Sequence, residues 1–118
     1  MVNKIITKRD IYTLIIAVSL LAMLWGQILN QKVINANDCL MPVYKSPDAD
    51  KFDKHFNYEN KADIEYWYLS DIIGWTNERI SIGDLFVYFG LIFSIAYSIL
   101  FGRNLIVELN RGETNREI

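Results

Sequence analysis

The chain has 118 residues, of which 52% are apolar, and this length allows only one compact unit. A formal net charge of −2 argues against a nucleic-acid-binding protein. One cysteine, Cys39, and one histidine, His55, exclude an internal disulfide and leave too few ligands for a Cys/His metal site. The sequence shows no catalytic constellation and no cofactor motif, so we expect a protein that is not an enzyme and binds no metal, cofactor or nucleic acid.

Residues 11–29 form an apolar run without charge, preceded by Lys8, Arg9 and Asp10. About twenty residues match the roughly 30 Å hydrocarbon core of a bilayer. Ten of them are Ile, Leu or Val, which contribute about −3 to −6 kcal/mol of insertion free energy. A cleaved signal peptide is the alternative, but no clear small-residue cleavage site follows. We predict a cytoplasmic tail over 1–10 and a transmembrane helix over 11–30.

The polar segment 31–79 is predicted to be an extracytoplasmic loop with short amphipathic helices. Pro42 and Pro47 favour extended backbone before them, and Ser46 with Pro47 indicates a helix start. Phe52 and Phe56 would lie one turn apart on that helix, with His55 at the surface beside them. A second helix is expected over 61–73, ended by Gly74.

Aromatic side chains in this loop are candidates for contact with a partner: Phe52, Phe56, Trp67, Tyr68 and Trp75. The second short helix could lie in the membrane interface, or these aromatics could form a cap over the helix ends. A carbohydrate or peptide platform is a third interpretation.

A second apolar run, residues 85–101, is also free of charge, and Arg103 follows it. We predict a transmembrane helix over 80–102 and a cytoplasmic tail over 103–118. Ser81 and Asp84 fit a capping box at the start of this helix. An ion or proton ligand is the alternative role for Asp84.

Small residues recur on both predicted spans. They are Ser19, Ala22 and Gly26 on the first, and Gly90, Ser94, Ser98 and Gly102 on the second. Such stripes let helix backbones approach closely in lipid. We expect the stripes to pack the two helices together; the alternative is that one of them faces another protein.

Positive residues are denser in the two tails than in the loop, which predicts that both ends are cytoplasmic. The fold class is therefore an all-α protein of the cell (inner) membrane. Its two transmembrane helices would form an antiparallel hairpin with a loop of about fifty residues outside.

Several short motifs occur in order after the first span: Asn37, Met41-Pro42-Val43, His55, Asp71-Ile72-Ile73 and Ser81-Ile82-Gly83-Asp84. In this order the chain resembles an uncharacterised family of prokaryotic multi-span membrane proteins. The similarity would cover Asn37 to the end of the second span. The resemblance implies a membrane location and no known activity. This chain departs from the pattern in having two spans and lacking glycines after Asn37.

The function these features favour is a non-catalytic accessory or structural subunit of a larger membrane protein complex. It would pack through the small-residue stripes and the aromatic loop, with the lipid bilayer and other membrane subunits, or further copies of itself, as partners. A homo-oligomeric pore or small transporter, such as a holin-like protein, is the alternative. A membrane enzyme would need Asp71, Asp84 and His55, which are scattered in sequence, to come together.

Overall fold

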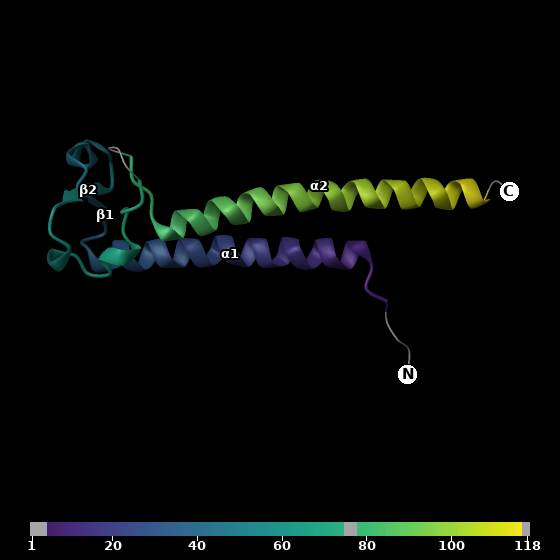
Figure 1. Ribbon diagram of the computed structural model, residues 1–118, viewed down its shortest axis with the longest axis horizontal. Coiled ribbons are helices and arrows are strands. Elements are labelled where there is room, and N and C mark those ends of the chain that lie inside the picture. Colours follow the sequence, from purple (N-terminus) through teal and green to yellow (C-terminus); the bar gives the residue numbers. More distant parts are fainter. Residues whose placement is uncertain (1–4, 75–77, 117–118) are drawn as a thin grey trace.

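The computed structural model describes residues 5–74 and 78–116, with side chains up to residue 112. Two long helices, α1 (Lys8–Ala36) and α2 (Ile82–Arg116), lie side by side, and a small cap covers one pair of their ends (Figure 1). Both helices are long and apolar enough to cross a membrane, so the prediction of two such helices is confirmed. Each helix is longer than the predicted span: α1 has 29 residues, about 44 Å, and α2 has 35 residues, although it begins two residues later than the predicted 80–102.

The contact between α1 and α2 follows spacings that alternate between three and four residues. On α1 the half-buried and buried positions of this seam are Arg9, Tyr12, Ile16, Ser19, Met23, Gly26, Asn30 and Val33. On α2 they are Gly83, Val87, Gly90, Ser94, Tyr97, Phe101 and Asn104. A repeat of seven residues keeps one face of each helix turned to its neighbour over many turns.

Glycines allow the two backbones to meet in the half of the seam nearer the cap. A Cβ atom on Gly90 would lie 2.5 Å from both Met23 Cγ and the Ser19 carbonyl oxygen. Gly26 and Gly83 face each other in the same way, and a Cβ on either would overlap the other's carbonyl oxygen. Side chains fill the seam farther from the cap. There the Tyr12 and Tyr97 ring centroids are 5.9 Å apart, and Arg9 Nη2 lies 2.7 Å from Glu108 Oε2.

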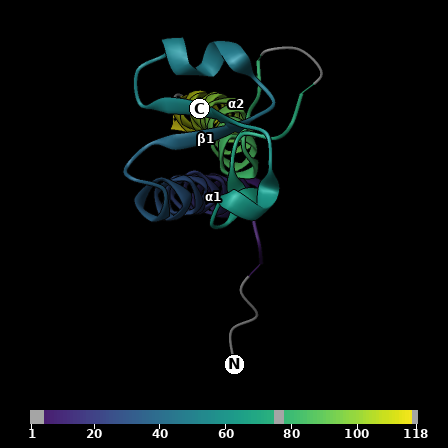
Figure 2. The ribbon, with the colours of Figure 1, turned by 90° about the vertical axis from the view of Figure 1, so that its left-hand side faces the viewer.

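The cap is built on two short parallel strands, β1 (Met41–Tyr44) and β2 (His55–Tyr58), with Val43 opposite Asn57. The chain passes between them through a 3₁₀ turn over Pro47–Lys51. Val43 also forms a bridge with Asp71, which adds a third extended segment beside β1. Seen end-on, the sheet lies across the ends of both helices (Figure 2). Its core consists of Val33, Met41, Val43, Ala49, Tyr58 and Ile64.

The prediction of a helix carrying Phe52 and Phe56 one turn apart is wrong. The turn after Ser46 begins at Pro47 as expected, but it ends at Lys51 and the Ser46 side chain makes no capping hydrogen bond. Phe52 already has extended backbone, and Phe56 lies in β2 opposite Pro42. Phe56 pairs with β1 instead of continuing a helix, because this pairing satisfies the backbone groups of β2 inside the cap.

The predicted amphipathic helix over 61–73 is also wrong. Only two single 3₁₀ turns form, Lys61–Asp63 and Trp67–Leu69, and they are separated by Tyr66 at a φ of 55°. A left-handed residue ends any helix that reaches it. Asp71 then donates its backbone N–H to the Pro42 carbonyl at 3.0 Å, so the end of the segment pairs with β1 instead.

Candidate functional site

A polar cluster joins α1 and α2 where the helices meet the cap. Asn30 Nδ2 donates to Asp84 Oδ1 at 2.8 Å, and Ser81 Oγ donates to Asn30 Oδ1 at 2.6 Å. Asp84 Oδ2 accepts from the Ser81 N–H at 3.2 Å, and Ser81 Oγ accepts from the Asp84 N–H at 3.0 Å. Ser81 and Asp84 therefore cap α2 and hold α1 at the same time. Sequence reasoning missed Asn30. This residue lies four positions after Gly26, on the spacing of the seam between the helices, and that position could have drawn attention to it.

The cap contains a pocket of about 370 Å³. It is lined by Val43, Ser46, Ala49, Phe52, Asp53, His55, Asp71, Glu78 and Arg79. Of the three titratable residues that an enzyme would need, the fold brings His55 and Asp71 together, because His55 is on β2 and Asp71 pairs with β1. The distance between His55 Nε2 and Asp71 Oδ2 is 3.9 Å. Asp84 lies outside this pocket, in the polar cluster.

Asp71 is buried, with 5% of its surface exposed, and its Oδ1 has no hydrogen-bond partner among the described residues. Burial, with a smaller contribution from the charge on Asp84, raises the pKa of the Asp71 carboxyl to about 7. Burial also raises the pKa of the neighbouring Tyr58 phenol, which shares a hydrogen bond of 2.7 Å with Ser70 Oγ. The pocket therefore holds a carboxyl group that gains and loses its proton near neutral pH.

The stability of the cap should fall as pH rises from about 4 to about 7. In this window folded Asp71 keeps a proton that the unfolded chain, with a pKa of 3.8, has released. The destabilisation is complete above pH 7, and the difference between the two pKa values corresponds to at most about 4 kcal/mol. In Asp71→Asn the free energy of unfolding, followed in detergent by near-UV circular dichroism, should lose this dependence. Asp63→Asn, an exposed change in the same cap, should keep it.

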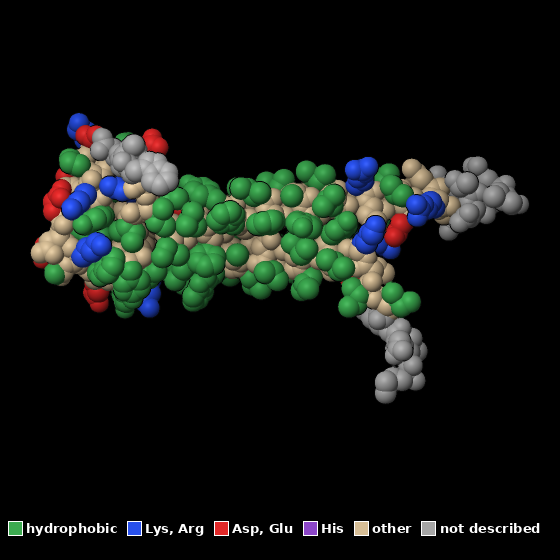
Figure 3. Space-filling model, viewed as in Figure 1, with side chains coloured by type: hydrophobic (Ala, Val, Ile, Leu, Met, Phe, Trp, Pro, Cys, Tyr) green, Lys and Arg blue, Asp and Glu red, His purple; other side chains and the backbone are tan. Residues whose placement is uncertain are grey.

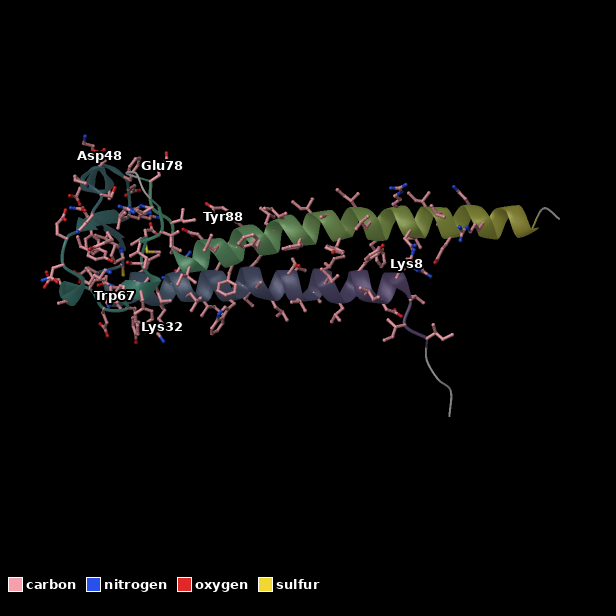
Figure 4. All side chains as sticks on the ribbon, in the orientation of Figure 1. Lys8, Lys32, Asp48, Trp67, Glu78 and Tyr88 are labelled. Atoms are coloured by element: carbon pink, nitrogen blue, oxygen red, sulfur yellow. The ribbon has the colours of Figure 1, made fainter. Side chains whose placement is uncertain are left out.

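The aromatic residues predicted to contact a partner differ in their exposure and surroundings, as far as the structure describes them. Phe52 is 64% exposed at the pocket, whereas Phe56 is half-buried in β2. Trp67 and Tyr68 lie edge to face with ring centroids 5.9 Å apart, and the Lys61 ammonium sits 4.4 Å from the Trp67 ring centre. Figure 4 shows Trp67 in the cap. Trp75 lies outside the described residues.

The small-residue stripe on α2 is divided between two environments. Gly90 and Ser94 are buried against α1, together with Ser19 and Gly26, and Ala22 is half-buried beside them. Ser98 is exposed, and a Cβ on Gly102 would have no described atom within 4 Å. The reason is geometric: at 3.6 residues per turn, each step of four residues rotates about 40° around the helix. The stripe thus turns away from α1 after Ser94.

The motifs that carried the resemblance in the sequence meet in and under the cap. Asn37 Nδ2 donates to the carbonyls of Val33 and Glu65, at 2.8 and 2.9 Å, and so ties the end of α1 to the loop. Met41-Pro42-Val43 is the central segment of the sheet, and Asp71-Ile72-Ile73 is its neighbour. His55 faces Asp71, and the Ser-x-Gly-Asp segment forms the polar cluster. These segments account for the cap's sheet, its pocket and its attachment to the helices.

The fold defines a two-helix protein with candidate membrane spans and a small folded cap. The sequence model of a family of unknown function (DUF5317) matches residues 11–96. The chain belongs to this family, which confirms the resemblance to an uncharacterised family and extends it over α1. No curated protein and no solved structure is detectably similar.

Proposed function

We propose that α1 and α2 cross the cell membrane as an antiparallel hairpin, with the cap outside and both ends in the cytoplasm. Only 11% of the most apolar stretch of each helix is buried within the structure, so the remaining apolar surface needs lipid or protein around it. In Figure 3 hydrophobic side chains cover the paired helices and charged ones gather at the two ends. Figure 4 places Lys8 at the end away from the cap and Lys32 at the cap. The higher density of Lys and Arg in the tails than in the loop supports the orientation.

Within this arrangement, we propose that the protein is a non-catalytic accessory subunit of a larger membrane complex. The observation that carries the proposal is the part of the α2 stripe that α1 leaves open. Ser98 lines an apolar groove of about 420 Å³ together with Ile16, Leu20, Ser94, Ile95 and Ile99. Small residues beside such a groove allow a further transmembrane helix to approach closely, and packing is what drives helix association in lipid.

A tagged chain expressed at native level and purified in mild detergent should bring down a second membrane protein in stoichiometric amount. Ser98→Phe fills the groove and should reduce that partner at least tenfold, as measured by quantitative mass spectrometry. Ala96→Phe adds comparable bulk at an exposed position about 160° around α2 from Ser98 and should leave recovery unchanged.

Two results would contradict the accessory role. Recovery of the protein alone as a monomer would rule out the accessory role. Recovery alone at the mass of several copies would favour the homo-oligomeric pore instead, and conductance in a planar bilayer would then be the next measurement.

A further inference from the structure

The cap pocket is independent of the membrane groove, because it is built from β1, β2 and the segments on either side of residues 75–77. Its polar centre is Asp71, which is 95% buried and whose Oδ1 has no hydrogen-bond partner within the described part of the chain. An acceptor buried without a partner is destabilising, so the fold retains this group at the expense of its own stability. The carboxyl group lines the pocket, so a cation that enters the pocket comes close to its negative charge.

We propose that this pocket is a binding site for a small amphipathic amine, whose ammonium group pairs with Asp71 and whose apolar body packs against Val43, Ala49 and Phe52. The volume of about 370 Å³ lies at the lower end of small-molecule sites, so the ligand is small. Three acids, Asp53, Asp71 and Glu78, line the walls against one guanidinium, Arg79, which favours a positively charged group. Phe52, at 64% exposure, stands where a ligand's apolar part can cover it.

Arg79 adds a second requirement. Its Nε is buried and has no hydrogen-bond partner among the described residues, while Nη1 donates to the Gly74 carbonyl. Arg79 lines the pocket, so a ligand that carries a hydroxyl or carboxylate oxygen beside its amine brings that oxygen close to the guanidinium charge. The chemical class is therefore an amino alcohol or an amino acid with an aliphatic side chain.

Binding of an ammonium group should be linked to the proton on Asp71. The ligand pairs with the ionised carboxylate, so binding competes with protonation. The other groups that face Asp71 are His55 on β2, Tyr58 on the same strand, Asp84 at the start of α2, and Arg79 in the pocket wall.

The test is calorimetric titration of L-leucinol, a small amine with a hydroxyl and an isobutyl group, into the full-length protein in lipid nanodiscs. We expect saturable binding at pH 8 and affinity at least thirtyfold weaker at pH 5.5, where about one Asp71 carboxyl in thirty is ionised. Asp71→Asn should weaken binding at pH 8 at least tenfold. Asp63→Asn removes an acid of the same cap that does not line the pocket, and it should bind as the original chain does.

A second measurement needs no variant: the ¹³C resonance of the Asp71 carboxyl followed against pH with and without L-leucinol. Its midpoint should fall from about 7 when the amine is bound. Absence of binding at millimolar concentrations, or binding that Asp71→Asn leaves unchanged, would overturn the proposal. So would a midpoint that the amine does not move. None of these results depends on whether the protein is an accessory subunit.

Discussion

Gly90→Ala should separate α1 from α2, although it adds only one methyl group. The added Cβ would stand 2.5 Å from the Ser19 carbonyl oxygen and from Met23 Cγ. Met23 can move, but the Ser19 oxygen belongs to the helix backbone and moves only with α1. Overpacking of this kind costs about 1–3 kcal/mol. The measurement is the free energy of unfolding in mixed micelles, titrated with sodium dodecyl sulfate and followed by circular dichroism.

Gly102→Ala is the matched control on the same helix. Its Cβ would meet no described atom within 4 Å, and alanine is the better helix former. We expect stability equal to or slightly above that of the original chain. Equal losses at Gly90 and Gly102 would contradict the close approach of the two helices at Gly90.

Asn30→Leu should be at least as disruptive, because it removes two hydrogen bonds between helices and leaves their partners in place. Asp84 Oδ1 would lose its donor and the Ser81 hydroxyl its acceptor, both in part-buried surroundings. A hydrogen bond to a charged group contributes about 1.5–3 kcal/mol, and a neutral one about 1 kcal/mol. We expect a loss of about 2–4 kcal/mol in the same mixed-micelle titration.

Gln31→Leu makes a similar chemical change at the next position of α1. Gln31 is exposed and bonds only to Asn35 of its own helix, at 2.6 Å, among the interactions described. The free energy of unfolding of Gln31→Leu should fall by less than about 0.5 kcal/mol, as is usual for substitutions at the surface. If Asn30→Leu were as mild as Gln31→Leu, the polar cluster would not be what holds α1 to α2.

The two long helices could be predicted from sequence because their signal is local. An uncharged apolar run of about twenty residues is enough to indicate each one, whatever lies around it. How the helices pack could be predicted only in part. The stripe on α2 drew attention to Gly90 and Ser94, but a four-residue spacing placed Ser98 and Gly102 in the same contact. The seven-residue seam, visible in Tyr12, Ser19, Gly26 and Val33, is the pattern the structure uses.

A cap over the helix ends was one of the sequence-based interpretations, but its internal order could not be predicted, because that order comes from residues far apart in the chain. Met41–Tyr44 pairs in parallel with His55–Tyr58, and Asp71 reaches back to Pro42. The turns between them use left-handed backbone at Lys45, Lys54 and Tyr66, residue types that give no turn signal. The burial of Asp71 is a product of that pairing. In the sequence Asp71 is one of fourteen acidic residues, and nothing in the sequence indicates that it lies in a pocket beside His55.

Cys39 allows the most direct test of the proposal that the helices cross the membrane with the cap outside. It is the only cysteine of the chain, and it is exposed between α1 and β1. A membrane-impermeant maleimide added to intact cells should label the original chain. It should not label Cys39→Ser/Gly112→Cys, whose thiol would lie at the far end of α2, until the cells are opened. Labelling of Gly112→Cys in intact cells, with Cys39 protected until lysis, would reverse the orientation. Equal labelling of both positions in intact cells would contradict a membrane crossing between them.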